Sequence, residues 1–193
     1  MDFEKTFQKY GPTYMGVGWG SEESQNKRFS KICEYIPIKD DTNIVDIGCG
    51  YGALLQYMHN NLWNPYYYGM DRNKEALAYI RSKRSMTYTI DIRSTSMLKT
   101  LLDKIHTIDY IVCCGLFQHM PKLIGEDLIK VFIEYAPRSI ISTRSDRSNR
   151  DKEKFVEWSL SDIEKVTRNV TNKFIIDHSY MRHDVTIVMD KET

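Results

Sequence analysis

The residues most suited to chemistry surround a glycine-rich turn that follows a short apolar segment. Residues 43–47 have the character of a buried strand, and Gly48, Gly50 and Gly52 come directly after them. Residues 53–58 then form an amphipathic segment, which is typical of a helix. Glycine lets the backbone turn tightly and approach a ligand, because it has no Cβ. The order of strand, glycine turn and helix therefore predicts a ligand beside the end of the strand.

Two carboxylates near this turn indicate the kind of ligand. Asp71 follows the next strand-like segment, residues 66–70, and a carboxylate there can accept hydrogen bonds from both hydroxyls of a ribose. Asp46 precedes the first glycine by two residues and would repel a pyrophosphate at this turn. It suits a ligand with an amine or a sulfonium, although a carboxylate in this position can also cap the turn. Together these features predict a nucleoside that carries a positive charge.

The run Asp46-x-Gly48-x-Gly50-x-Gly52, with Asp71 in register, resembles the class I S-adenosylmethionine-dependent methyltransferases. It differs from the Gly-x-Gly-x-x-Gly pattern of dinucleotide-binding proteins. The resemblance covers residues 40–190 and implies that S-adenosyl-L-methionine is the cofactor. It also implies that the glycine run, with Cys49, wraps the methionine end of the cofactor, and that Asp71 holds its ribose.

The resemblance implies further cofactor contacts at later positions. Arg72 would border the adenine. Asp91 ends the expected third strand, where an acid would accept a hydrogen bond from the adenine amino group while the backbone amide of Ile92 meets a ring nitrogen. Cys114 and Gly115 end the expected fourth strand and would lie under the methionine portion. The predicted cofactor site thus draws on several strand ends.

His119, four residues after Gly115, is the candidate general base. The pKa of histidine ordinarily lies near neutrality, so this side chain could take a proton from a methyl acceptor. A histidine after such a strand can equally be a helix-start residue that packs under the site. Methyl transfer depends mainly on holding donor and acceptor in line, so a general base is not obligatory.

The N-terminal segment, residues 1–36, is expected to cover the cofactor site. Trp19 could wall the pocket, and Arg28 could pair with the cofactor carboxylate, because arginine offers a bidentate grip. The alternative is a flap that only packs on the sheet. A basic run expected on the same rim could bind an anion or form a solvated loop. Its members are Arg138, Arg144, Arg147, Arg150, Lys152 and Lys154.

Apolar periodicity and turn residues predict alternating strands and helices. Strands are expected at 43–47, 66–70, 87–91, 108–114, 139–143, 174–182 and 184–190, with His183-Asp184 as the tight connection between the last two. Helices are expected at 21–36, 53–60, 74–82, 98–105, 122–136 and from 161 onward. This order predicts an α/β three-layer sandwich, with a mostly parallel seven-stranded sheet, a C-terminal antiparallel hairpin and helices on both faces. We expect one methyltransferase-like domain over residues 1–193, with a Rossmann-like core over 40–193.

Composition narrows the class of protein without naming its substrate. The chain has 193 residues, 41% of them hydrophobic, which is ordinary for a soluble globular protein. Its net charge of +1 gives no strong field that would favour nucleic acid or a membrane. No apolar run approaches the about twenty residues that span a bilayer, and the N-terminus lacks a signal-peptide core. We therefore expect a cytoplasmic protein, with its four cysteines reduced and not in a zinc site.

The function expected from the sequence is S-adenosylmethionine-dependent methyl transfer to O or N of a small or medium-sized acceptor. RNA, DNA and protein acceptors stay open, no membrane partner is expected, and the oligomeric state cannot be read. One alternative is an enzyme that transfers an aminopropyl or aminocarboxypropyl group, or cleaves the cofactor. Another is a non-catalytic binding module. The N-terminal segment and residues 144–154 are where acceptor contacts are expected, because fold alone does not fix the acceptor.

Overall fold

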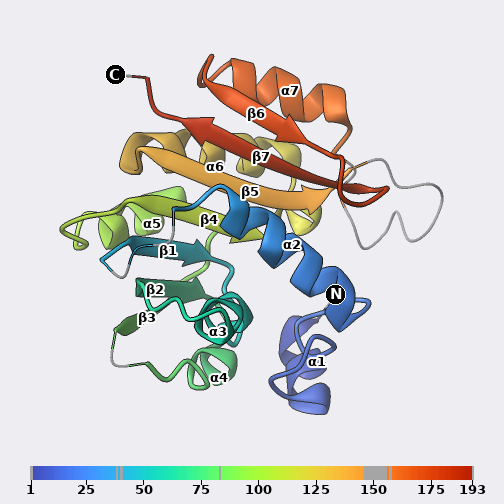
Figure 1. The fold of residues 1–193 in the computed structure, drawn as a ribbon, viewed down its shortest axis with the longest axis vertical. Coiled ribbons are helices and arrows are strands. Elements are labelled where there is room, and N and C mark those ends of the chain that lie inside the picture. Colours follow the sequence, from blue (N-terminus) through green and yellow to red (C-terminus); the bar gives the residue numbers. More distant parts are fainter. Residues whose placement is uncertain are drawn as a thin grey trace.

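The structure is a computed structural model that describes residues 2–37, 39, 41–82, 84–145, 156 and 158–192. Within these residues, seven strands form one sheet in the order β3-β2-β1-β4-β5-β7-β6 (Figure 1). The first five strands are parallel, and β7 pairs antiparallel with β5 and β6. The strands are β1 (Asn43–Ile47), β2 (Tyr66–Asp71), β3 (Ser85–Thr89), β4 (Tyr110–Cys114), β5 (Arg138–Arg144), β6 (Phe174–Asp177) and β7 (Asp184–Asp190). The predicted α/β fold, with its mostly parallel sheet and C-terminal hairpin, is confirmed.

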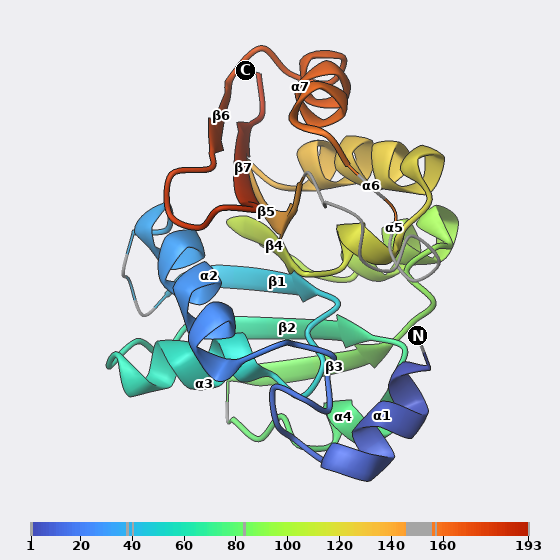
Figure 2. The ribbon, with the colours of Figure 1, turned by 90° about the vertical axis from the view of Figure 1, so that its right-hand side faces the viewer.

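Helices cover both faces of this sheet (Figures 1 and 2). They are α1 (Phe3–Tyr10), α2 (Glu22–Glu34), α3 (Ala53–Asn60), α4 (Lys74–Leu77), α5 (Thr95–Leu102), α6 (Lys122–Tyr135) and α7 (Leu160–Arg168), with the 3₁₀ helix η1 (Phe117–His119). On one face, Phe29 of α2 and Met58 of α3 join the apolar cluster of Ile44. On the other face, Phe132 of α6 joins the cluster of Val45, with residues of α5 and α7. Adjacent residues of β1 thus point to opposite cores, as expected for a strand buried on both faces.

Short polar side chains fix where the helices begin. The Ser21 hydroxyl accepts a hydrogen bond from the Ser24 amide at 3.1 Å, so α2 begins as predicted. Ser159 forms a capping box with Asp162 and begins α7 at Leu160. Such caps satisfy amide groups that have no partner within the helix. The helix α2 matters for the site, because Gln25, Arg28, Phe29 and Ile32 are its buried residues.

The predicted third strand is wrong at both ends. β3 covers Ser85–Thr89, so Asp91 lies two residues beyond the strand and not at its last position. In the described part of the chain β3 pairs with β2 alone, and most of its residues are exposed or half-buried. An edge strand of this kind lacks the buried alternation from which sequence reasoning places strand ends.

Other boundaries also differ from the prediction, among them those of α4, of α5, which covers Thr95–Leu102 and not 98–105, and of the connection between β6 and β7. α4 ends at Leu77, not at residue 82, because Ser82 and Ser85 hydrogen-bond each other and form a turn. The connection between β6 and β7 spans residues 178–183 and is not a tight turn at His183-Asp184. Asp177 organises this longer connection by accepting hydrogen bonds from the amide and hydroxyl of Ser179.

The predicted basic run does not lie on a single rim. Arg138 begins β5 and Arg144 ends it, so the two residues lie at opposite ends of this strand. The other members, Arg147, Arg150, Lys152 and Lys154, fall outside the described residues. None of the described helices is long and apolar enough to cross a membrane.

Candidate functional site

A cavity of ≈ 270 Å³, the first cavity, lies where the carboxyl ends of β1, β2 and β4 meet the N-terminal segment. In Figure 2, α1 stands beside the tips of β2 and β3, close to this end of the sheet. Among its lining residues are most of the predicted site residues: Trp19, Asp46, Gly48, Cys49, Gly50, Asp71, Arg72, Asp91, Ile92, Cys114, Gly115 and His119. The structure therefore brings together residues from three strand ends and from the N-terminal segment. Gly52 and Arg28 are the two predicted residues that do not line it.

Asp71 is held rigidly at the end of β2. Its Oδ2 accepts a hydrogen bond from the Gly50 amide, and its Oδ1 accepts one from the Asn73 amide, both at 2.9 Å. Each carboxylate oxygen keeps further acceptor capacity, and the side chain lines the first cavity. Burial raises the pKa of Asp71, while the amides of Asn73 and Gly50 oppose that shift. Asp71 thus links β2 to the glycine turn and presents a carboxylate to the cavity.

Asp46 is a buried carboxylate with no cationic hydrogen-bond partner among the described residues. The Tyr67 hydroxyl donates to its Oδ2 at 2.5 Å, and the residue is 3% exposed. Burial raises the pKa of Asp46 to about 7, the Tyr67 hydrogen bond lowers it, and the charge of Asp71 adds to the rise. A cation in the first cavity would offset this cost of desolvation. The site therefore favours a positively charged ligand near Asp46.

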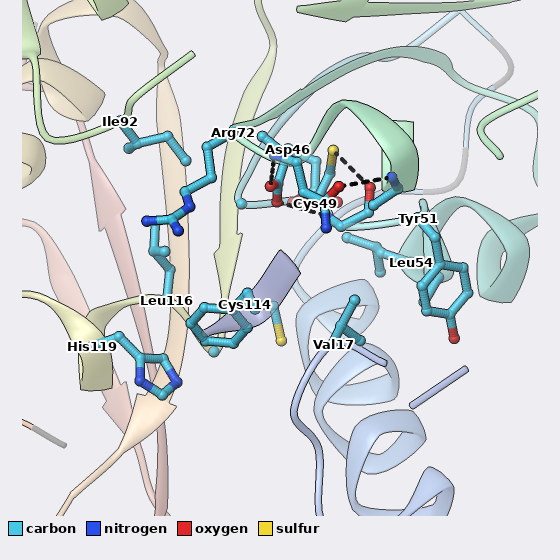
Figure 3. A pocket seen from close by; sticks show the side chains of 18 of the residues that line it. Val17, Asp46, Cys49, Tyr51, Leu54, Arg72, Ile92, Cys114, Leu116 and His119 are labelled. Carbon is cyan, nitrogen blue, oxygen red and sulfur yellow. Dashed lines mark hydrogen bonds between the residues drawn. The ribbon is translucent and has the colours of Figure 1, made fainter. Parts of the chain in front are cut away.

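The glycine turn brings its backbone against the cavity and the N-terminal segment. Gly50 has φ +56°, and a Cβ at this position would come within 2.9 Å of Val17 Cγ1. Gly48 has φ +79°, and a Cβ there would meet Leu116 at 3.3 Å. Both conformations disfavour residues with a side chain. Figure 3 shows Cys49 and Tyr51 of the turn with Val17 and Leu116 around the cavity.

Gly52 has a different role from the one predicted. It is the N-cap of α3 with φ +80°, and a Cβ there would meet Ile80 Cγ1 at 2.8 Å. Because it lies behind the cavity wall, this glycine allows the helix to begin and pack against the segment after α4. Its contribution to the site is therefore indirect.

The predicted adenine contacts lie at the open side of the cavity. Asp91 is paired with Arg93 through two hydrogen bonds of 2.9 and 2.6 Å, and both side chains are about half exposed. Ile92 is buried beside them. Arg72 is half exposed, and its guanidinium lies 3.9 Å from the Glu4 carboxylate. Arg93 is a cavity residue that the sequence reasoning missed, and the charge alternation of residues 91–93 was the only signal for it.

His119 and Trp19 stand where the first cavity meets a second one. The second cavity has a volume of ≈ 280 Å³, and its lining residues include Val17, Trp19, Gly115 and His119, which also line the first. Phe3 packs edge-on against the His119 ring at 5.0 Å between centroids. His119 Nε2 lies 3.3 Å from the Gln118 side-chain nitrogen. A proton acceptor at this junction could serve reactants in either cavity.

Arg28 lines the second cavity, where its partner is a residue of the protein. Its Nε and Nη2 donate to Asp184 at 2.7 and 2.6 Å, and the two side chains are 3% and 1% exposed. The guanidinium also stacks on Trp19 at 4.6 Å from the ring centroid. Arg28 therefore holds α2 to β7, and its guanidinium packs against the ring of Trp19. Nothing in the sequence marked Asp184 as this partner, because 156 residues separate the two.

Gly115 makes the junction of the two cavities possible. It has φ +78°, and a Cβ there would lie 3.1 Å from Trp19 and 3.8 Å from Arg28 Nη1. Sequence reasoning missed other lining residues of the first cavity, among them Asn73, Ala76 and Met120. Asn73 caps α4 by accepting a hydrogen bond from the Ala76 amide, and this cap was a readable signal. The described residues contain no group of three or more His, Cys, Asp or Glu side chains that could hold a metal ion.

Comparison with known proteins agrees with this arrangement. Residues 44–138, about half of the chain, match the model of a family described as a methyltransferase domain. A probable (S)-tetrahydroprotoberberine N-methyltransferase 2 of Papaver bracteatum is 28% identical over 104 residues, which cover 53% of this chain and 28% of the relative. The cyclopropane-fatty-acyl-phospholipid synthase of Escherichia coli is 26% identical over 114 residues, which cover 59% of this chain and 28% of the relative. The chain thus matches less than a third of the length of either.

A solved structure shares the whole fold. Magnesium protoporphyrin IX methyltransferase from Synechocystis, solved with bound S-adenosylhomocysteine, superposes with a TM-score of 0.66 at 13% identity, over 98% of this chain and 96% of that one. Residues 44–138 thus belong to a methyltransferase-domain family, and the sheet order and glycine turn of the chain are those of the class I S-adenosylmethionine-dependent methyltransferase fold.

Proposed function

We propose that the protein transfers a methyl group from S-adenosylmethionine to O or N of a small or medium-sized acceptor. The observation that carries this proposal is the pair of carboxylates, Asp46 and Asp71, that face one cavity without a cationic hydrogen-bond partner among the described residues. A nucleoside with a ribose and positive charge satisfies both. The cavity volume of ≈ 270 Å³ is near the lower end, about 300 Å³, of small-molecule sites.

Each residue then has a defined task. Asp71 would accept hydrogen bonds from the ribose hydroxyls, while Gly50 and Asn73 hold its oxygens in place. Asp46 would face the positively charged part of the cofactor, and Asp91 and Ile92 the adenine. When bound, S-adenosylmethionine supplies a methyl group on a positively charged sulfur, which is reactive without further activation. The protein therefore has mainly to exclude water and to align the acceptor, and His119 would take a proton where the acceptor loses one.

Binding of S-adenosylhomocysteine tests the cofactor site. Isothermal titration calorimetry should give a micromolar Kd for the wild type, and Asp71→Asn should weaken binding by about 10- to 100-fold, the effect of losing hydrogen bonds to a charged group. The matched control is Asp103→Asn, because Asp103 is an exposed acid that bonds Tyr135 far from the cavity. Absence of binding by the folded wild type would end the proposal.

Turnover tests the reaction. Incubation with methyl-labelled S-adenosylmethionine and fractionated extract should place label in a small molecule and release S-adenosylhomocysteine. Release of methylthioadenosine instead would favour aminopropyl transfer. Label in RNA, DNA or protein would replace the small acceptor with a macromolecule. A cytoplasmic location and a single domain over residues 1–193 belong to the same proposal.

A further inference from the structure

The second cavity adjoins the proposed methyl donor and has a different charge. Its charged lining residues include two guanidiniums, Arg28 and Arg144, and one carboxylate, Asp184. The first cavity is lined by three carboxylates and two guanidiniums. The two cavities share Val17, Trp19, Gly115 and His119. A molecule in the second cavity would therefore meet the cofactor across these residues.

The positive charge of the second cavity arises because the two arginine–aspartate pairs that lie opposite each other on β5 and β7 are bonded differently. β5 and β7 pair antiparallel, so that Arg138 lies opposite Asp190 and Arg144 lies opposite Asp184. At the first end, Arg138 donates to Asp190 through Nε at 2.6 Å and Nη2 at 3.0 Å. At the second end, Asp184 is instead occupied by Arg28 from α2. At this end, the single carboxylate of Asp184 lies beside the guanidiniums of both Arg28 and Arg144.

Arg144 is the guanidinium left with a surplus charge. Its Nε lies 3.5 Å from Asp184 Oδ1 and is buried without a hydrogen-bond partner in the part of the chain that the structure describes, while its side chain is 39% exposed. Burial lowers the pKa of Arg144, and the charge of Arg28 adds to that effect against the attraction of Asp184. An anion beside Arg144 would stabilise the charged guanidinium and supply the missing acceptor.

Gln118 gives a second, independent sign of a missing ligand group. It also lines the second cavity and is 9% exposed, and its Oε1 has no hydrogen-bond partner among the described residues. Its side-chain nitrogen lies beside His119. Buried polar atoms in native proteins almost always have a partner. A polar molecule in the cavity could accept a hydrogen bond from Arg144 Nε and donate one to Gln118 Oε1.

We infer that the second cavity binds the methyl acceptor through an anionic group, a carboxylate or a phosphate, held by Arg144. This inference rests on the proposed methyl transfer, and it adds the chemical class of the acceptor. The volume of ≈ 280 Å³ and one surplus positive charge suit a small molecule with a single anionic group. The anion at Arg144 would direct the rest of the acceptor toward His119 and the shared wall. Arg28 acts as a positioning residue, because it neutralises Asp184 and so leaves Arg144 available.

The test uses simple anions on the cofactor-loaded protein. Protein saturated with S-adenosylhomocysteine is titrated with sodium acetate and with sodium phosphate at constant ionic strength, and the arginine Nε–H signals are followed by NMR. The Arg144 signal, assigned by its loss in Arg144→Gln, should shift and saturate with at least one anion. The apparent Kd should rise about tenfold or more in Arg144→Gln, followed on backbone amides such as Gly115. Arg138→Gln is the matched control, because Arg138 lies at the opposite end of the same strand and is similarly exposed, at 36%. This variant should change that Kd less than twofold.

The outcomes separate this inference from the proposed function. Failure of S-adenosylhomocysteine to bind contradicts the proposed function itself. Normal binding of S-adenosylhomocysteine with no saturable response to either anion overturns the anionic acceptor alone. An Arg144→Gln variant that binds S-adenosylhomocysteine tenfold more weakly but methylthioadenosine normally assigns Arg144 to the cofactor carboxylate, and so overturns it as well. Arg144-dependent binding of a short single-stranded RNA, much tighter than that of phosphate, would replace the small acceptor with a polynucleotide.

Discussion

The two adjoining cavities of this protein have opposite electrostatic needs. In the first, Asp46 is 3% exposed, and among the residues that the structure describes its carboxylate has only the Tyr67 hydroxyl as a side-chain partner. In the second, Asp184 is 1% exposed and has Arg28 bound to it, with Arg144 nearby. A buried carboxylate without a cation favours a cationic ligand, whereas two guanidiniums on one carboxylate favour an anionic one. The contrast supports the proposal that the methyl donor and the methyl acceptor occupy different cavities.

The largest expected effect tests the ion pair that creates the contrast. Arg28→Met removes the main partner of a fully buried carboxylate and should lower the free energy of unfolding by about 3–5 kcal/mol, measured by urea denaturation. The double variant Arg28→Met, Asp184→Asn should recover much of this loss, because no buried charge is left without a partner. A loss below about 1 kcal/mol would mean that Arg144 replaces Arg28 as the partner of Asp184, and Arg28 would then not be the residue that leaves Arg144 available.

The next effect concerns the buried acid of the first cavity. The pKa of Asp46 in the folded protein, about 7, lies above its ordinary value of 3.8. The folded state therefore binds more protons than the unfolded state between these values, and Asp46 lowers stability as the pH rises through that window. Asp46→Asn should remove this loss, so its stability relative to wild type should improve by about 2–3 kcal/mol between pH 5 and pH 8.

Ligand binding by the same variant completes that test. Asp46→Asn should bind S-adenosylmethionine more weakly than wild type at pH 8, although it is the more stable protein. The positively charged sulfur makes this ligand more sensitive than S-adenosylhomocysteine. Urea denaturation at a series of pH values and calorimetry measure the two effects. A parallel pH dependence for variant and wild type would show that Asp46 is ionised throughout and that the first cavity does not select a cation in this way.

A smaller effect compares the two ends of β5. Arg138 and Asp190 form a bidentate pair whose side chains are 36% and 38% exposed. Because water and salt screen such a pair, Arg138→Gln should cost only about 0.5–1 kcal/mol in urea denaturation. The cost should shrink further at about 1 M NaCl, where screening is strong. A larger loss that does not depend on salt would indicate that the Arg138–Asp190 pair contributes as much to stability as the Arg28–Asp184 pair.

The smallest expected effect on stability is that of Arg144→Gln. Its Nε has no hydrogen-bond partner within the described ranges, so the free energy of unfolding should change by no more than about 0.5 kcal/mol, in either direction. The binding of simple anions should nevertheless weaken about tenfold or more. Of the two arginines at the ends of β5, Arg138 would then contribute to stability and Arg144 to anion binding. A destabilisation by Arg144→Gln as large as that by Arg28→Met would instead make Arg144 part of the structural ion pair.

The fold could be predicted largely because its signals are local. Buried parallel strands appear as short apolar runs, and Ser21 marks the start of α2 through its own hydrogen bond. Where burial is weak, prediction failed, as at the edge strand β3 and the connection after Asp177. Many residues that line the first cavity were also readable, because the glycine turn and Asp71 belong to consecutive elements. Gly52 shows the limit of that reading, since the same spacing does not say which glycine faces the cavity.

The sequence by itself determined the sheet, the glycine turn and the carboxylate at the end of β2, because each follows from the chemistry of neighbouring residues. It also contained an arginine at each end of β5 and an aspartate at each end of β7, which look equivalent as a pattern. Only the tertiary structure distinguished them, by bringing Arg28 to Asp184 across 156 residues. Charge pairing depends on distance in space and not along the chain, so the surplus charge of Arg144 exists only in the folded protein.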